Sequence, residues 1–329
     1  MVHVARKYFN RAYMDTLTHL ALGACIGTAF SPRHHTERFM LTGALVQVVP
    51  DLDVVVNLWM EPEAALMAHR GFTHSLLFAL LFSLFSSAWL PHSKSLDRSP
   101  GFWMVFLLVQ LLVHDFLDAF NAYGTALFIP FSFERVSFHA LYVVDPIFSV
   151  VPGMAVVLML LFRKIESIRI LVPTLTLLWC TLYLLFSIWL KYTVDTHVRS
   201  SAFIRSGEIS QFISTPMPFT NLNWYLVGEG RDGFYVGYQS VLDRVGDTEF
   251  TFFPRGDSLL TSFAHRPEVD ILKRFSDGWY TVSVANDTTA FNILRFGRHR
   301  DQEGEFVLRY FLNEGMNNHG RLVKGRTRM

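Results

Sequence analysis

Long apolar runs fill the first two thirds of the chain and stop near residue 190. A helix needs about 20 apolar residues to cross the hydrocarbon core of a bilayer. Two runs reach that length, Leu141–Phe162 and Ile168–Leu190, although one aspartate and two prolines interrupt the first. The shorter runs are Leu17–Phe30, Phe39–Val49, Phe72–Leu90 and Phe102–Val113. The pattern predicts an all-α polytopic membrane domain with about four to six inserted segments.

Beyond residue 195 the pattern changes to short aromatic and β-branched runs separated by Gly, Asp and Asn, which is typical of strands. These runs are GFYVGYQSVL, EFTFFP, GWYTVSVAN, TAFNILRFG and EFVLRYFL. We therefore predict a small β-rich soluble C-terminal domain, built as an antiparallel sheet or barrel, with Ser214–Tyr225 as a turn-rich entry to it. It contains no catalytic constellation. The predicted organisation is an N-terminal extension at 1–13, a transmembrane domain at 14–192 and the β-rich domain at 193–329.

The N-terminus allows two interpretations. A basic start followed by a short apolar stretch is compatible with a secretory signal peptide, but Asp15 and His19 interrupt the position where its apolar core would begin. The alternative is that Met14 is the true start and that residues 1–13 are an extension.

Composition narrows the function classes. The apolar content is 51% and the net charge is +1, with no basic stripe, so we predict no nucleic-acid partner. Cys25 and Cys180 lie far apart in apolar runs, which argues against a disulfide framework and against a thiolate metal site. The sequence leaves open whether the protein has protein partners.

The short loops indicate an orientation through their basic residues. If every run spans, seven arginines and lysines share one side, against two in the opposite loops. The basic loops are 31–38, 91–101 and 163–169. We predict that they lie in the cytoplasm of a bacterial inner membrane, which puts the C-terminal domain on the periplasmic side. The basic residues of 1–13 oppose this orientation unless Met14 is the start.

Five polar clusters stand at run ends, and in the spanning arrangement all five fall on the same side of the membrane. They are MDTLTH from Met14, VPDLD from Val49, HRGFTH from His69, HDFLDAFNAYGT from His114 and VVDP from Val143. Helical spacing of i,i+4 pairs Asp15 with His19, and His114 with Asp118. The same spacing within HRGFTH pairs His69 with Thr73 and Arg70 with His74.

Each cluster also has a simpler interpretation. VPDLD is compatible with a helix cap and turn, Asp118 with an ion pair to Arg135, and Asp115 with a position facing water. Together, however, the clusters supply the nitrogen and oxygen ligands that suit Zn, Mn or Fe, and ionisable residues at membrane depth are commonly functional. The predicted metal-binding residues are His19, Asp51, Asp53, His69, His74, His114 and Asp118.

The remaining predicted site residues act around the metal. Arg70 is expected to hold an anionic substrate oxygen, for which its fixed fork of donors is suited. Asp15 or Asp145 is expected to orient water or to act as a base. Thr73 and Asn121 are expected to support these groups.

The motifs MDxxTH, PDLD, HRGxTHS, HxxxD with NxYGT, PFS and VDP, in this order from Met14 to Pro146, resemble those of the YdjM family. The resemblance implies a LexA-regulated, membrane-bound, metal-dependent hydrolase, and it supports the roles of the residues named above. Asp115 departs from the family pattern, in which an apolar residue follows the histidine, and a β-rich tail is not general to the family. A more distant similarity to zinc-dependent phospholipase C and P1-type nucleases favours phosphoester substrates.

The sequence hypothesis is thus a metal-dependent hydrolase, with zinc as the first choice of metal and manganese or iron as alternatives. Its metal would activate water to attack an ester in a membrane lipid or another membrane-proximal molecule. The rival hypotheses are an ion-coupled transporter, which also uses intramembrane Asp and His, and a non-catalytic protein with a structural metal. Transporters often show repeat symmetry between halves, and no such repeat is seen here.

Overall fold

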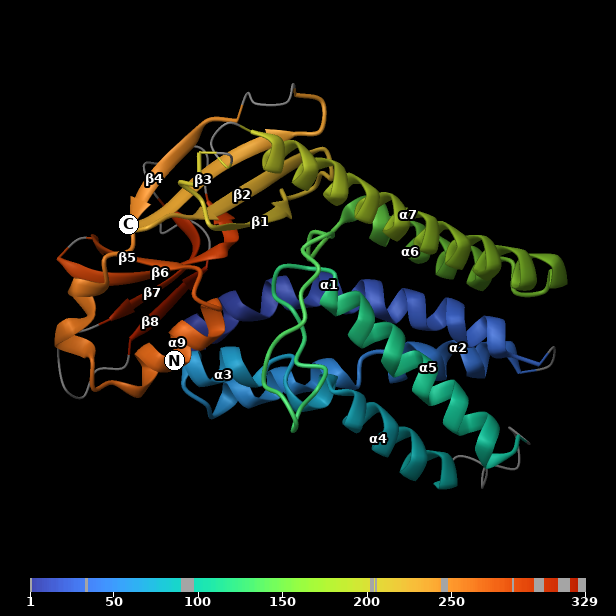
Figure 1. Cartoon of the computed structure of the whole chain (residues 1–329). Helices are drawn as coiled ribbons and strands as arrows, with labels where there is room; N and C mark the ends of the chain where they lie inside the picture. Colours follow the sequence, from blue (N-terminus) through green and yellow to red (C-terminus); the bar gives the residue numbers. More distant parts are fainter. Residues whose placement is uncertain are drawn as a thin grey trace. The chain divides into compact units, whose positions relative to one another are not determined.

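The computed structural model shows a helical unit and a β-rich unit (Figure 1). The helical unit comprises Met1–Leu58, Ala68–Phe138 and Val143–Phe186, and the β-rich unit comprises Trp59–Met67, His139–Tyr142 and Ser187–Met329. Side chains are described throughout the ranges given next, except at 2–15, 321 and 324. The structure describes residues 2–32, 35–89, 98–201, 204, 206–243, 248–285, 287–298, 305–312 and 320–324.

Apolar helices build the first part of the chain, as the sequence predicts. The first five helical elements are α1 (Val2–Phe30), α2 (Thr36–Val46), the 3₁₀-helix η1 (Pro50–Leu58), α3 (Pro62–Ala68) and the 3₁₀-turn η2 (Phe72–His74). They are followed by α4 (Leu76–Trp89), α5 (Pro100–Ala119), α6 (Pro146–Leu161) and α7 (Glu166–Ser200).

Two to four of these elements have the length and apolarity of membrane spans. Helices α5 and α7 qualify alone. Two bent pairs qualify together: α2 with η1, bent by 47°, and Pro62–His74 with α4, bent by 51°. The stretch Thr16–Phe30 and helix α6 are apolar but shorter.

The helix limits differ from the apolar runs where capping groups intervene. Of the run Leu141–Phe162, only α6 is helical, because the Asp145 carboxylate accepts hydrogen bonds from the Ile147 and Phe148 amides and Pro146 occupies the first helical position. Conversely, α5 is longer than its apolar run, since Ser99 caps it at one end and it continues through the polar cluster at the other.

Glycines bring α1 and α2 into close contact. A Cβ atom at Gly27 would lie 2.1 Å from the Phe39 carbonyl oxygen, and one at Gly43 would lie 2.2 Å from the Gly23 carbonyl oxygen. In a membrane, helices gain little from the hydrophobic effect when they associate, so small residues that allow close backbone packing are the usual contact.

Two buried glutamines join this pair of helices to α5. The Gln47 side-chain amide donates to the Gln110 carbonyl oxygen at 2.9 Å and to its side-chain oxygen at 3.2 Å. The Gln110 amide in turn donates to the Gly23 carbonyl oxygen at 3.2 Å. A cluster of fully buried side chains packs beside them, made of Phe39, Ala79, Trp103, Phe106, Leu107 and Leu111 with Val46.

The β-rich unit contains two four-stranded antiparallel sheets rather than the one sheet or barrel that the sequence suggested. The first is β1 (Gln211–Pro216), β2 (Asn223–Glu229), β3 (Gly233–Ser240) and β4 (Phe250–Pro254), in that order. The second is β5 (Tyr280–Ala285), β6 (Thr288–Arg298), β7 (Phe306–Leu312) and β8 (Arg321–Lys324). The 3₁₀-helix η4 (Asp257–Phe263) and helix α9 (Pro267–Ser276) connect them.

All five predicted strand runs are strands, β3 to β7, whereas β1, β2 and β8 were not expected. The predicted turn-rich entry contains the end of β1, a turn and the start of β2, paired in register from Pro216 with Trp224 to Gln211 with Glu229. One apolar cluster takes side chains from both sheets: Tyr225, Val227, Phe234, Val236, Trp279, Leu294 and Phe306.

The last turns of α7 belong to the core of the β-rich unit. Leu190, Val194 and Val198 pack against Trp224 and Leu226 of β2. The Lys191 ammonium donates to the Ser214 hydroxyl of β1 at 2.8 Å and lies 3.3 Å from the Asp195 carboxylate. This partly buried polar link joins the helix to the first sheet.

We predict that Gly27→Ala destabilises the helical unit, because its methyl group would meet the Phe39 backbone. Overpacking of this kind costs about 1–3 kcal/mol. Thermal unfolding in detergent measures the effect. Gly153→Ala in α6 is the matched control, since a Cβ there meets nothing within 4 Å; equal melting temperatures for the two variants would contradict the close crossing.

A second prediction concerns His139, whose Nδ1 lies 3.0 Å from the Thr215 hydroxyl. Burial lowers the pKa of His139 to about 3, and the cations of Arg295 and Lys191 act in the same direction. The unfolded chain binds a proton below about pH 6.5 that the folded chain does not, so stability falls as the pH drops from 6.5 towards 3. In acid titrations followed by circular dichroism, we expect His139→Gln to unfold at a lower pH than the wild type. An unchanged acid midpoint would contradict this.

Candidate metal centre

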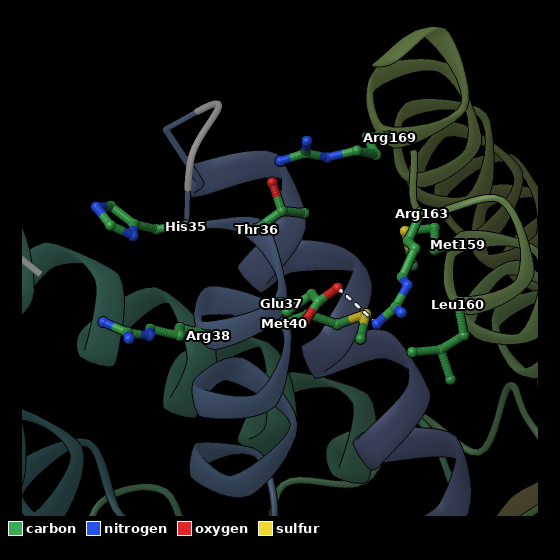
Figure 2. Close-up of a pocket in the computed structure, with 9 residues that line it drawn as sticks. All are labelled: His35, Thr36, Glu37, Arg38, Met40, Met159, Leu160, Arg163 and Arg169. Carbon is green, nitrogen blue, oxygen red and sulfur yellow. Dashed lines mark hydrogen bonds and ion pairs between the residues drawn. The ribbon is translucent and has the colours of Figure 1, made fainter. Parts of the chain in front are cut away.

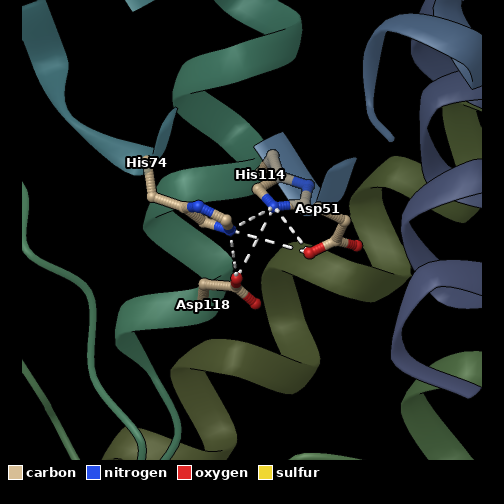
Figure 3. Close-up of side chains that lie close together, drawn as sticks. All are labelled: Asp51, His74, His114 and Asp118. Carbon is tan, nitrogen blue, oxygen red and sulfur yellow. Dashed lines mark hydrogen bonds and ion pairs between the residues drawn. The ribbon is translucent and has the colours of Figure 1, made fainter. Parts of the chain in front are cut away.

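Four donor groups from three segments, three of them buried and Asp51 partly exposed, face one another (Figure 3). Asp51 comes from η1, His74 from η2, and His114 and Asp118 from one face of α5. One ligand atom from each lies within 4.8 Å of all the others. The i,i+4 spacing of His114 and Asp118 therefore does what the sequence predicts and directs both side chains to the same place.

Five of the six separations between the donor atoms agree with a small tetrahedral ion. His74 Nε2 lies 3.2 Å from His114 Nε2, 3.6 Å from Asp51 Oδ1 and 3.3 Å from Asp118 Oδ2. His114 Nε2 lies 3.7 Å from Asp51 Oδ1 and 3.5 Å from Asp118 Oδ2. Donors that bind zinc at 2.0–2.2 Å in a tetrahedron stand about 3.3–3.6 Å apart. Two imidazoles and two carboxylates at these distances could hold a divalent metal ion.

Asp118 joins this group to two further residues. Its Oδ1 lies 3.0 Å from the Arg70 guanidinium and 3.2 Å from His19 Nε2, while its Oδ2 faces the two histidines of the four-donor group. His19 thus lies beside the centre and contacts it through Asp118 and through the His114 ring, whose centroid lies 3.9 Å from that of His19. The simpler interpretation, in which Asp118 pairs with Arg135, is wrong, because Arg70 is its cationic partner.

Asp53 faces a different side of η1 from Asp51. In a 3₁₀-helix, residues two apart point about 120° away from each other. The Asp53 carboxylate lies 2.8 Å from His69 Nδ1, accepts from the Arg70 amide at 2.8 Å, and lies 3.4 Å from His74 Nδ1. A carboxylate on the far nitrogen of a ligating histidine fixes the ring and raises its basicity. Asp53 is placed to do this for His74.

The segment HRGFTH is a turn followed by η2 and not the continuous helix that its i,i+4 pairing implied. Arg70 has φ of 56°, in the left-handed region that non-glycine residues seldom adopt. Its amide donates to Asp53, and its carbonyl oxygen accepts from the Ala126 amide at 3.1 Å. These two bonds hold the turn and thereby place His69 and His74 on either side of Asp53.

Arg70 is buried, which changes the expectation for its side chain. Besides Asp118, its guanidinium donates to the Asn121 side-chain oxygen at 2.8 Å, and it lies over the Tyr123 ring. The expected supporting role of Asn121 has a geometric basis in this contact, as that of Thr73 has in its hydrogen bond to Asp53 at 3.2 Å. Because Arg70 is buried beside Asp118, its guanidinium orients the Asp118 carboxylate.

Of the two predicted bases, one lies elsewhere, and the side chain of the other is outside the described residues. Asp145 caps α6 and accepts from the Tyr183 hydroxyl at 2.8 Å, outside the four-donor group. The Asp15 backbone is in α1, but its side chain lies outside the described residues.

Sequence reasoning missed two features of this region. Arg135 donates to the His69 carbonyl oxygen at 2.8 Å and lies on the Tyr123 ring, as Arg70 also does. Asp115, expected to face water, is buried, and neither of its carboxylate oxygens has a hydrogen-bond partner among the described residues. Its position next to His114 was the only available signal.

The centre is accessible from one edge. The side chains of His74, His114 and Asp118 are almost fully buried, whereas Asp51 is 14% exposed and the neighbouring His69 is 26% exposed. Gly23, Gln47 and Gln110, each four residues from His19, Asp51 or His114 in the sequence, form a buried hydrogen-bonded layer. A substrate would therefore arrive at the Asp51 and His69 edge.

Comparison with known proteins places the motifs in a family context. The family described as YdjM inner membrane protein matches residues 14–194. The uncharacterized protein YfhP of Bacillus subtilis (strain 168) is 31% identical over 144 residues, which are 40% of this chain and 42% of that protein. The inner membrane protein YbcI of Escherichia coli (strain K12) is 33% identical over 125 residues, 36% of this chain and 69% of that protein. No solved structure matches the chain.

We predict that Asp53→Asn weakens metal binding without removing a donor from the four-donor group. Loss of a partner that orients a ligand commonly costs 10–100-fold in metal affinity. Competition against a chromophoric chelator on detergent-purified protein measures this. Asp145→Asn is the control, since it makes the same change to a buried carboxylate of the helical unit outside the group; an equal loss in both variants would argue against the Asp53 contact.

Proposed function

The chain belongs to the YdjM inner membrane protein family, and from this premise we propose that it is a membrane-bound, metal-dependent hydrolase. The observation that carries the proposal is the group of two histidines and two aspartates whose ligand atoms all lie within 4.8 Å of one another, with Asp51 partly exposed. This donor set is typical of zinc and is compatible with manganese or iron. When bound, such an ion supplies an activated water and polarises an ester oxygen.

The chain's own residues prepare the site for this chemistry. Asp53 holds the His74 ring through Nδ1, so that Nε2 is directed at the other donors. Arg70 and His19 compensate the Asp118 charge on one oxygen and leave the other for the centre. His69, oriented by Asp53 and exposed at the open edge, is the residue we assign to proton transfer, its ring centroid lying 6.1 Å from that of His74. The roles of Asp15 and Asp145 as bases remain predictions.

A phosphoester in a lipid or another membrane-proximal molecule is the substrate class we favour. Exposed apolar side chains follow the two residues of the open edge in the sequence: Leu52 and Val55 after Asp51, and Phe72 after His69. In a membrane protein, such side chains contact lipid, so a lipid substrate would reach the centre without leaving the bilayer. We place this edge and the β-rich unit on the periplasmic side, following the loop charges.

Access from one side distinguishes this proposal from a transporter. Alternating access requires a route from the site to the other face of the membrane. Here the glutamine layer and the apolar cluster of Phe39, Trp103 and Phe106 fill the space beyond the donors. The third possibility, a structural metal, shares the site geometry and differs in having no turnover.

The proposal predicts one or two equivalents of zinc, manganese or iron in protein purified in detergent. Removing two donors in His74→Ala/Asp118→Ala abolishes metal binding and turnover. His265→Ala/Asp270→Ala, which changes the same residue types at exposed positions of the β-rich unit, keeps both. Elemental analysis gives the metal content, and hydrolysis of a water-soluble aryl phosphate ester and of a phospholipid in mixed micelles gives the activity.

Each alternative has its own outcome in this experiment. A folded wild type without metal contradicts the proposal and favours the transporter. Stoichiometric metal whose chelation unfolds the protein, with no hydrolysis of either ester, favours the structural metal.

A further inference from the structure

A cavity of about 500 Å³ opens at the other end of α2, away from the metal centre (Figure 2). It lies where the N-terminus of α2, the end of α6 and the first turn of α7 meet, all within the helical unit. Because α2 rises about 1.5 Å per residue over its 11 residues, roughly 16 Å of helix separates the cavity from η1 and its donors. The residues that line it are His35, Thr36, Glu37, Arg38, Met40, Met159, Leu160, Arg163 and Arg169.

The polar lining carries an excess of positive charge. Arg38, Arg163 and Arg169 supply three cations, and Glu37 supplies one anion. Figure 2 shows Arg163 directed at Glu37 and Arg169 extending from α7 towards α2, whereas His35 and Arg38 extend to the other side of the α2 N-terminus. The first turn of α2 adds the positive end of a helix dipole.

The Arg163–Glu37 pair is weak enough to be exchanged. Their charged groups lie 3.4 Å apart, and the side chains are 62% and 65% exposed. Exposed pairs of this kind contribute little to stability. A ligand oxyanion could therefore take the place of the Glu37 carboxylate at Arg163, and a guanidinium binds phosphate through two parallel hydrogen bonds.

The rest of the lining is apolar. Met159 is buried against Cys25 and Ala155, with Met40 packed against the same cluster, and Leu160 is exposed beside it. Methionines adapt to irregular flexible groups such as acyl chains. A site with cations on one part of its wall and methionines on the other fits an amphiphile better than a simple anion.

The loops that form the cavity also favour an amphiphilic ligand. Loops 31–38 and 163–169, which the sequence predicts to share the cytoplasmic side, both contribute to it. Basic pockets between helices on that side of a membrane are where anionic headgroups bind. We propose that the cavity binds the phosphate group of an anionic phospholipid, with Arg163 and Arg169 at the phosphate and Met159 and Leu160 along the acyl chain.

The test measures thermal unfolding of the full chain in neutral detergent during titration with phosphatidylglycerol, phosphatidylcholine or inorganic phosphate. We expect a saturable rise in melting temperature with phosphatidylglycerol and a smaller one with phosphatidylcholine. Arg163→Gln/Arg169→Gln should weaken the apparent affinity by about tenfold or more, since each basic residue near an anionic surface contributes about 1 kcal/mol. Glu37→Gln should strengthen it by removing the competing carboxylate.

Lys164→Gln/Arg98→Gln is the matched control, because it removes two cations from the same predicted side and neither residue lines the cavity. Arg163→Lys/Arg169→Lys keeps the charge and should retain part of the affinity, which separates ligand binding from damage to the fold. A saturable shift with inorganic phosphate that the same glutamine variants abolish supports the phosphate site with free phosphate as its ligand. Equal shifts with both lipids, or equal losses in the two double-glutamine variants, overturn the proposal.

Discussion

The helical unit is organised around the contacts of one buried carboxylate, that of Asp118. A buried carboxylate without partners costs several kcal/mol, so each of its oxygens needs compensation. Arg70 and His19 meet one oxygen, and His74 and His114 face the other. Since these partners come from α1, from the HRGFTH turn and from α5 itself, the requirement to compensate one charge joins three segments. The same requirement assembles the four donors.

Contacts one helical turn away from the donors set the register of α1, α2 and α5 relative to one another. Gly23, Gln47 and Gln110 each stand four residues before or after a residue of the centre: His19, Asp51 and His114 respectively. Their hydrogen bonds therefore form a layer parallel to the layer of donors. In a lipid environment, where apolar contact alone gives little preference between registers, a buried amide pair and a glycine contact are the groups able to fix one. The metal centre depends on this layer for the relative height of α1, α2 and α5.

The sequence predicts most of this architecture, and its errors have local physical causes. Helical periodicity was sufficient for His114 and Asp118, because both lie in the regular part of α5. It failed at Arg70 and His74, because Arg70 is held in the left-handed region by two hydrogen bonds to residues distant in sequence: its amide donates to Asp53, and its carbonyl oxygen accepts from Ala126. Composition alone could not tell which carboxylate of VPDLD faces the donors, since that follows from the 3₁₀ geometry. The strands β1 and β2 were missed because Pro216 and Asn223 resemble turn residues, although both pair in the ladder.

The arrangement of layers also bears on what the protein can do. Beyond the glutamine layer, Phe39 stacks on Trp103 with 5.2 Å between ring centroids, and Phe106 packs edge-on against both. Beneath the donors, then, come a hydrogen-bonded layer and an aromatic one, both buried, and the basic cavity lies at the far end of α2. A conduit for ions would have to break each of these layers in turn. A hydrolase needs none of them to move, because its substrate and product use the edge at Asp51 and His69. The packing beside the donors is thus buried while Asp51 and His69 are partly exposed, and this favours the proposed chemistry at the membrane surface over passage through it.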